Sequence, residues 1–247
     1  MPWRETLAAA ARICVLTGAG MSAESGIPTF RDSLTGLWAR FDPAQLASEQ
    51  GYRAEPQRVW DWYAERADGV RRAQPNAGHR ALAAFAARRP GVVSLVTQNV
   101  DDLHQRAGQS GVIRLHGDIL GARWLDPRCA RAGRSRGVVC DPAAAAPGRP
   151  PSCAECGNRV RPAVVWFGEA MPTAALDAAE RAAAACRVML VIGTSGAVWP
   201  AAGLAGVARA AGAQVLVINP APSELDAQAH GVLRGTAATL LPRLLAP

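Results

Sequence analysis

Four short apolar runs along the chain are rich in β-branched residues and predict buried strands. They are Ile13–Thr17, Val92–Thr97, Val188–Ile192 and Val215–Ile218. Alanine-rich stretches with helical spacing lie between these runs, at Gly78–Arg89, Thr173–Cys186 and Ala201–Ala211. Strands that alternate with helices are typical of a parallel, doubly wound sheet, so the pattern predicts an α/β fold.

Small or polar residues follow each predicted strand. They are Gly18-Ala19-Gly20, Gln98-Asn99, Gly193-Thr194-Ser195 and Asn219. Ligands of doubly wound sheets bind beyond the carboxyl ends of the strands. These strand ends therefore predict a binding pocket at one edge of the sheet.

Two segments interrupt the alternation. Residues 34–74 hold six of the 13 aromatic side chains, at helical spacing, and residues 119–162 are rich in Arg, Pro, Gly and Cys. We expect both to be insertions that build a second, smaller lobe. The predicted division is a sheet domain of residues 1–33, 75–118 and 163–247, a helical module of residues 34–74 and a cysteine module of residues 119–162.

Composition narrows the class of protein. The chain has 247 residues with 49% hydrophobic and 19% charged, which argues against disorder. It contains no lysine, and its 27 basic residues exceed 20 acidic ones. The arginines are spread along the chain, so a nucleic-acid partner is not favoured. No apolar run of about 18 residues predicts a membrane span. The N-terminus makes a poor signal peptide, so we expect a cytoplasmic protein with reduced thiols or metal ligands.

The strand end at Gly18 opens the string GAGMSAESGIPTFRD. Glycines between a strand and a helix present backbone N–H groups to an anion, which predicts a phosphate site; a tight structural turn is the alternative. At the next strand end the amides of Gln98 and Asn99 suit a carboxamide or a ribose. Helix capping by Asn99 or Asp101 is the alternative there.

His116 ends an apolar run beside a glycine, where its ring can face a cleft and act as a general base. His79 and His104 are interpreted as structural. The apolar segment Val164–Glu169 is either core or an edge that pairs with an extended peptide.

Cys153 and Cys156 form a CxxC knuckle, which is half of a tetrahedral zinc site. Cys129 and Cys140 are the candidates for the other two ligands, although their spacing is not that of a knuckle. The two remaining cysteines lie in apolar surroundings, which is typical of core positions.

Several motifs in this order resemble the sirtuins, the NAD-dependent protein-lysine deacylases. The strings are GAGMSAESGIPTFRD, QPNAGH, TQNVDDLH, LHG, VVWFGE, GTSGAVWPAA and the closing INP and GTA, over about residues 12–243. The resemblance implies a Rossmann-like domain with a smaller lobe made of a helical module and a zinc module. It also implies NAD as cofactor and acylated-lysine proteins or peptides as partners.

The resemblance assigns roles to residues at matching positions. An NAD-binding stretch with its loop is implied at Gly18, Ala19, Gly20, Ser22, Glu24, Phe30, Arg31 and Trp38. Nicotinamide and ribose contacts are implied at Gln98, Asn99 and Asp101, and an adenosine side at Gly193, Thr194, Ser195, Asn219 and Ala237. His116 is the implied catalytic base, and Val165, Trp166 and Phe167 are the implied substrate clamp.

In the implied reaction, nicotinamide leaves C1′ of the NAD ribose and the acyl-lysine oxygen attacks that carbon. His116 removes a proton through the ribose hydroxyls. Water completes the transfer, and the products are free lysine, nicotinamide and 2′-O-acyl-ADP-ribose.

The acyl group is indicated by a match to the class III branch, whose members favour acidic acyl groups. Tyr63 and Arg66 share a helix face, where an arginine can bind a distal carboxylate, and the small Ala47 leaves room for a longer chain. We therefore expect a desuccinylase or demalonylase with some deacetylase activity. A plain deacetylase, a mono-ADP-ribosyltransferase and a non-enzymatic NAD-responsive binding module are the alternatives.

The chain departs from the family in its zinc module. Where the family places its first CxxC pair, this sequence has Trp124-Leu125-Asp126-Pro127. We expect one structural zinc to be retained at Cys129, Cys140, Cys153 and Cys156.

Overall fold

The computed structural model describes residues 2–29, 42–126, 145–146 and 149–246. Five residues with expected roles lie outside the described residues: Phe30, Arg31 and Trp38 of the cofactor stretch, and Cys129 and Cys140 of the zinc module. Within the described residues, none of the helices is both long enough and apolar enough to cross a membrane.

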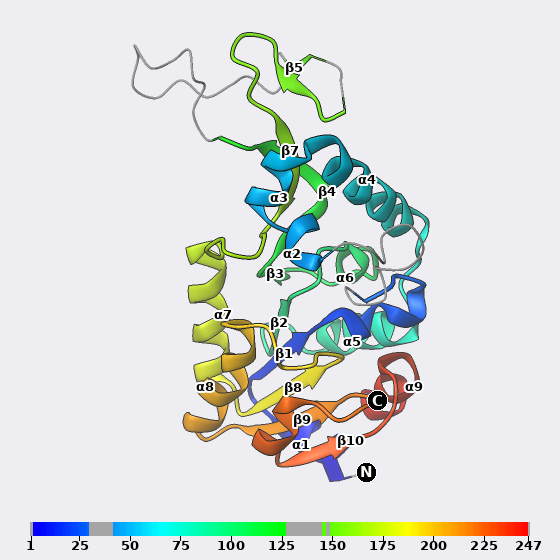
Figure 1. The fold of residues 1–247 in the computed structure, drawn as a ribbon. Coiled ribbons are helices and arrows are strands. Elements are labelled where there is room, and N and C mark those ends of the chain that lie inside the picture. Colours follow the sequence, from blue (N-terminus) through cyan, green and yellow to red (C-terminus); the bar gives the residue numbers. More distant parts are fainter. Residues whose placement is uncertain (1, 30–41, 127–144, 147–148, 247) are drawn as a thin grey trace.

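A six-stranded sheet forms the centre of the larger lobe (Figure 1). Its strands are β1 (Ile13–Thr17), β2 (Val93–Thr97), β3 (Ile113–Arg114), β8 (Val188–Ile192), β9 (Gln214–Ile218) and β10 (Gly231–Leu233). They pair in the order β10-β9-β8-β1-β2-β3, and every pairing is parallel. The direction in which the chain adds strands reverses between β1 and β8, and doubly wound sheets bind their ligands at such a switch point.

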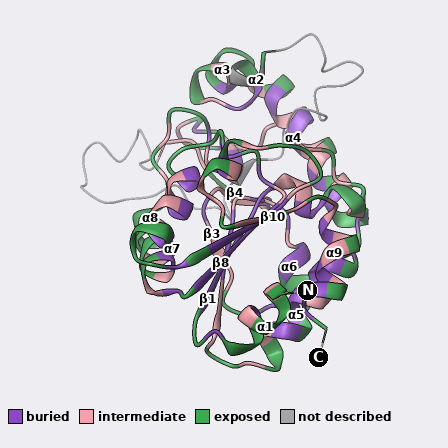
Figure 2. Cartoon of the chain, turned by 90° about the horizontal axis from the view of Figure 1, so that it is seen from below, coloured by how far each residue is buried: buried purple, intermediate pink, exposed green. Residues whose placement is uncertain are grey.

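Helices cover both faces of this sheet, as the parallel pattern requires. One face carries α1 (Pro2–Ala9), α5 (Ala77–Ala87) and α9 (Ala237–Leu244), and the other carries α7 (Thr173–Ala185) and α8 (Leu204–Ala210). Successive residues of β1 alternate between the two cores, with Val15 on one side and Cys14 and Leu16 on the other. Buried strands between helices with exposed outer faces are visible in Figure 2. The predicted α/β fold is confirmed.

Several local predictions are corrected by the structure. The helix expected after Gly20 is replaced by two short 3₁₀ helices, η1 (Ala19–Met21) and η2 (Ala23–Ser25). Gly26 ends the second one with a φ of 81°, a left-handed conformation that glycine adopts without strain. The helix expected from Ala201 begins as the 3₁₀ helix η6 (Ala201–Gly203) before α8. The sequence analysis did not predict α1, α9 or β10.

The smaller lobe is built from the two segments that interrupt the alternation (Figure 1). The first supplies α2 (Pro43–Leu46), α3 (Glu49–Ala54) and α4 (Pro56–Arg72). The second supplies the antiparallel pairs β4 (Gly117–Trp124) with β7 (Val160–Val164) and β5 (Ala145–Ala146) with β6 (Ser152–Cys153). Buried aromatic side chains of the first segment, Tyr52, Trp62 and Tyr63, share one core with Trp166, which follows β7. Since β4 follows His116 directly, this lobe is anchored beside the carboxyl end of β3.

Candidate active site

The strand ends at the switch point approach each other very closely. The N–H of Gly20 donates to the carbonyl of Gly193 at 2.8 Å. A Cβ built at Gly18 would lie 2.7 Å from the Cβ of Thr194, so a larger residue cannot be accommodated without movement of the chain. This contact explains the glycines after the first predicted strand, and these backbone atoms form the floor of the switch point.

A cavity of about 620 Å³ opens beside this floor, between the two lobes. Its volume lies within the range of small-molecule sites, which is roughly 300–1,000 Å³. Twelve of the residues with expected roles line it: Ala19, Ser22, Ala47, Tyr63, Arg66, Gln98, Asn99, Asp101, His116, Val165, Trp166 and Phe167. The structure therefore brings the expected cofactor, catalytic and acyl residues to one cavity.

Three polar side chains form a hydrogen-bonded group on the floor of the cavity. The hydroxyl of Ser22 donates to Oδ2 of Asp101 at 2.8 Å, and the amide of Asn99 donates to Ser22 Oγ at 3.1 Å. Oδ1 of Asp101 also accepts from the N–H of Leu103 at 3.0 Å, so this carboxylate caps a helical turn as well. Burial raises the pKa of Asp101 above its usual value. The group is fixed in place and can present polar atoms to a ribose or an amide.

A second polar group joins the cavity to the far half of the sheet. Gln98 Nε2 donates to Thr194 Oγ1 at 3.1 Å, and Asn219 Nδ2 donates to the carbonyl of Thr194 at 3.4 Å. Glu24 does not line the cavity; its carboxylate accepts a hydrogen bond from the N–H of Ala238, at the start of α9. The expected adenosine-side residues at the ends of β8 and β9 thus adjoin the cavity without lining it.

His116 is held in one orientation by the backbone. Its Nδ1 lies 3.0 Å from the carbonyl oxygen of Gln98. Because a carbonyl can only accept, Nδ1 carries the proton and Nε2 is left as the acceptor of the ring. Burial lowers the pKa of His116 from its ordinary value of 6.5. The ring is therefore neutral at physiological pH, which is the form that a general base requires.

His79 and His104 have structural surroundings, as interpreted from the sequence. His79 Nδ1 accepts from the N–H of Asn76 and completes the N-cap of α5. His104 Nε2 lies 3.1 Å from the hydroxyl of Thr17 in the buried core. Burial lowers the pKa of His79 to about 4, with a smaller contribution from Arg80. Burial also lowers the pKa of His104 to about 3, with a smaller contribution from His79. Both rings are neutral near pH 7.

The end of the cavity where acyl-group recognition is expected is lined by Tyr63 and Arg66 of α4. Tyr63 and Arg66 lie one helical turn apart, and the guanidinium carbon of Arg66 lies 4.5 Å from the ring centre of Trp62 and 5.7 Å from that of Tyr63. Stacking on aromatic faces restrains the orientation of an arginine. Burial lowers the pKa of Arg66, because desolvation disfavours the charged form. Such a site favours an anionic ligand.

The segment Val165–Phe167 forms one wall and is held by the backbone on both sides. The N–H of Val165 donates to the carbonyl of His116 at 2.9 Å, and the N–H of Phe167 donates to the carbonyl of Ala47 at 2.8 Å. The Phe167 side chain is 53% exposed at the rim.

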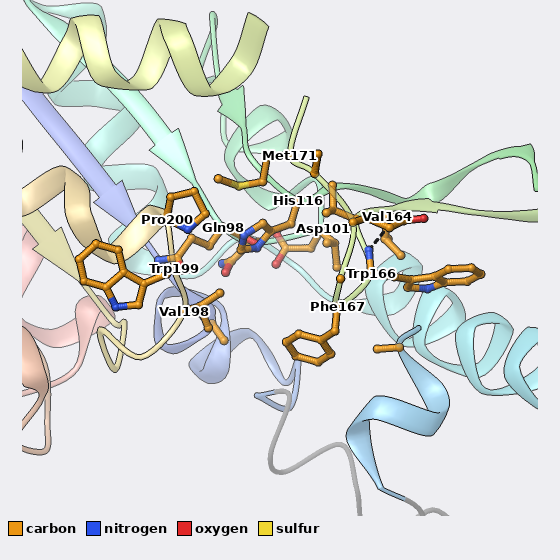
Figure 3. Close-up of a pocket in the computed structure, with 18 of the residues that line it drawn as sticks. Gln98, Asp101, His116, Val164, Trp166, Phe167, Met171, Val198, Trp199 and Pro200 are labelled. Atoms are coloured by element: carbon orange, nitrogen blue, oxygen red, sulfur yellow. Dashed lines mark hydrogen bonds between the residues drawn. The ribbon is translucent and has the colours of Figure 1, made fainter. Parts of the chain in front are cut away.

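The opposite wall was missed by the sequence analysis. In Figure 3, Val198, Trp199 and Pro200 lie across His116 from Phe167. The Trp199 side chain is 70% exposed, which is unusual for a tryptophan. These three residues belong to the GTSGAVWPAA string, in which the resemblance implies roles only for Gly193, Thr194 and Ser195.

The described CxxC pair, Cys153 and Cys156, does not line the cavity. Cys153 and Cys156 flank a turn in which the N–H of Gly157 donates to the carbonyl of Cys153 at 2.9 Å. Gly157 has a φ of 73°, so the turn has the sharp bend of a CxxC knuckle. Trp124 packs against Cys153. Among the described residues alone, no group of three or more potential metal ligands comes together.

The fold and the cavity together define a class of protein. The strand order and the polar groups at the switch point are those of a nucleotide-binding α/β enzyme, and the histidine beside them is its candidate base. A sequence profile described as the Sir2 family matches residues 18–200. The chain therefore belongs to the Sir2 family, and its resemblance to the sirtuins is confirmed.

Curated relatives match over nearly their whole length. A protein of Ralstonia nicotianae called "NAD-dependent protein deacylase" is 56% identical, over 98% of this chain and 94% of the relative. "NAD-dependent protein deacylase 1" of Pseudomonas aeruginosa is 49% identical, over 98% and 96%. A Mycobacterium tuberculosis protein, again called "NAD-dependent protein deacylase", is 47% identical, over 95% and 96%.

Solved structures agree with this family. A Sir2 homologue in complex with NAD is 42% identical with a TM-score of 0.84, and the match covers 99% of this chain and 91% of the other. A complex of Sir2 with a p53 peptide and NAD+ is 26% identical with a TM-score of 0.81, over 99% and 96%.

Proposed function

We propose that this NAD-dependent protein deacylase prefers acidic acyl groups, succinyl and malonyl, to acetyl. Membership of the Sir2 family and the names of the relatives support the general activity. The acyl preference rests on one observation: Tyr63 and Arg66 line the same cavity as His116.

The floor of the cavity fits NAD by the chemistry of its groups. Ser22, Asn99 and Asp101 offer hydroxyl, amide and carboxylate atoms that suit a ribose or the carboxamide of nicotinamide. The close contact of Gly18 with Thr194 lies at the switch point, where doubly wound sheets bind dinucleotides. When bound, NAD supplies an electrophilic ribose carbon as nicotinamide departs.

The described residues supply the catalytic base and the substrate-binding wall. His116 accepts a proton at Nε2, because its Nδ1–H is committed to the carbonyl of Gln98. The wall at Val165 and Phe167 already uses its own N–H groups within the protein. A substrate strand lying here would therefore donate its N–H groups to the carbonyl oxygens of this wall. The acyl-lysine side chain would enter between Phe167 and Val198.

The distal carboxylate of a succinyl or malonyl group would meet Arg66 and Tyr63. An arginine that is poorly solvated gains more from an anion than an exposed one does, because little water must be displaced from it. Ala47 lines the same cavity and leaves space for the longer chain. An acetyl group has no distal carboxylate to present to this pair.

We also propose that the cysteine module keeps one structural zinc, with Cys129 and Cys140 completing the pair Cys153 and Cys156. The knuckle geometry of the described pair fits thiolate ligation. Metal analysis of the purified protein should give one zinc per chain, and Cys153→Ser should remove it. Less than stoichiometric zinc in the unaltered protein would reject this site.

One assay tests the acyl preference directly. Peptides that differ only in an acetyl-, malonyl- or succinyl-lysine are incubated with NAD, and products are followed by mass spectrometry. We expect the kcat/KM values for the two acidic peptides to exceed that for the acetyl peptide. Equal or higher values for the acetyl peptide would favour a plain deacetylase, and NAD-dependent modification of protein without deacylation would indicate ADP-ribosyl transfer.

A further inference from the structure

We propose that Trp166 fixes the direction in which Tyr63 donates its hydrogen bond, and so acts as a positioning residue for acyl-group selection. This inference deepens the proposed function and rests on the role given there to Tyr63 and Arg66. Trp166 would thus orient the Tyr63 hydroxyl in addition to forming part of the substrate wall.

The contact that carries the inference joins two buried side chains. Trp166 Nε1 lies 3.1 Å from the hydroxyl oxygen of Tyr63. Both residues line the cavity, although the Trp166 side chain is only 2% exposed. In Figure 3 the Trp166 indole points away from His116, whereas Phe167 stands at the rim. The indole therefore serves the acyl end of the cavity, not the reacting end.

The chemistry of the two groups decides which of them donates. An indole nitrogen has a proton and no available lone pair, so it can only donate. Tyr63 Oη must accept this bond, and its own proton must lie on the other side of the oxygen. Burial raises the pKa of Tyr63 to about 12, so the hydroxyl keeps that proton at physiological pH. Tyr63 is thereby prepared to donate to a ligand atom that can accept.

The indole is itself held firmly. The guanidinium carbon of Arg161 lies 3.2 Å from the ring centre of Trp166, and Arg161 is 2% exposed. Arg161 is paired with Glu169, whose Oε2 also accepts the backbone N–H of Trp166 at 2.9 Å. The ring of Tyr52 packs against another part of the indole, with centres 5.2 Å apart. The orientation of Nε1 is thus set by the smaller lobe before any ligand binds.

This arrangement selects among acyl groups. A carboxylate has only acceptor atoms, so it matches both the donor direction of Tyr63 and the cation of Arg66. An acetyl group offers no atom for this pair. Without the indole N–H the Tyr63 hydroxyl could turn its proton elsewhere, and part of the preference for a carboxylate would be lost.

The test uses Trp166→Phe, which keeps an aromatic ring on Arg161 but removes the N–H. The measured quantity is the ratio of kcat/KM for succinyl and acetyl peptides, because some loss on both peptides is expected from a wall residue. This ratio should fall about 3- to 10-fold, the worth of one ordinary hydrogen bond. The loss should appear in the KM of the succinyl peptide, since the carboxylate is remote from the reacting atoms.

Three further variants make the result decisive. Tyr63→Phe should lower the ratio by about 10-fold or more, because a bond to a charged group is lost. The double variant should show no further fall beyond Tyr63→Phe, because both changes remove one interaction. Tyr52→Phe is the matched control: it alters another ring against the same indole and should leave the ratio within about twofold. Melting curves check that each variant folds.

Two results would overturn the inference while leaving the proposed function intact. One is an unchanged ratio in Trp166→Phe when Tyr63→Phe lowers it. The other is a double variant whose losses add. If Tyr63→Phe and Arg66→Met both leave the ratio unchanged, the proposed acyl preference and this inference fail together.

Discussion

Replacing Arg66 with methionine should remove the preference for acidic acyl groups without abolishing deacylase activity. Methionine keeps an unbranched apolar stem against Trp62 and Tyr63 but lacks the charge. The residue is half-buried at the wall of the cavity, where burial lowers the pKa of its guanidinium. The change therefore isolates the electrostatic part of recognition from the packing part.

The size of the effect follows from the kind of bond that is lost. A hydrogen bond to a charged group contributes about 1.5–3 kcal/mol. Since about 1.4 kcal/mol corresponds to a tenfold change, kcat/KM for the succinyl peptide should fall about 10- to 150-fold. The acetyl peptide lacks the carboxylate, so its kcat/KM should change by less than about threefold, the scale of a small packing change.

The assay compares both peptides at saturating NAD, with Arg71→Met as the control. Arg71 is an exposed arginine of the same helix, paired with Asp68, and it does not line the cavity. Its loss should leave the ratio of the two kcat/KM values unchanged. Equal losses on the two peptides in Arg66→Met would refute the proposed carboxylate site, because a general disturbance would then explain the result.

Further predictions concern the base and the buried ion pair. His116→Ala should abolish turnover while NAD binding, followed by calorimetry, persists; near-normal turnover would remove His116 from the mechanism. Because burial holds the pKa of His116 below 6.5, the acid limb of kcat/KM should fall off below that pH, and a midpoint above it would contradict a neutral buried ring. Glu169→Ala leaves Arg161 buried without its partner, so the free energy of unfolding should drop by about 3 kcal/mol in denaturant titrations. Burial raises the pKa of Glu169, but the hydrogen bonds from Arg161 and Trp166 outweigh burial and hold the pKa below 4.5. The difference in the free energy of unfolding between the two proteins should therefore be complete above pH 4.5. It should shrink as the pH falls through the folded pKa of Glu169. A drop of less than about 1 kcal/mol near pH 7 would mean that the pair is solvated.

The sheet and its pocket could be predicted because their signals are local. Strands such as Val188–Ile192 are continuous apolar runs, and the parallel pattern puts all their carboxyl ends at one edge. His116 and Arg66 were found through motifs of a few residues.

Other features depend on distant parts of the chain, so no local pattern reveals them. The bond between Trp166 and Tyr63 joins residues 103 positions apart. The buried hydroxyl pair of Thr17 and Thr97 forms only because two strands lie in register. The expected helix after Gly20 failed for a related reason: close contact with Gly193 determines the path of the chain there.

The central claim is best tested by product stoichiometry with a succinyl-lysine peptide and NAD. Mass spectrometry should show one nicotinamide, one free lysine side chain and one succinyl-ADP-ribose for each turnover. Because the chain itself contains no lysine, every deacylated lysine side chain must come from the peptide. Lysine released without NAD consumption, or NAD consumed without acyl transfer to ADP-ribose, would contradict the account.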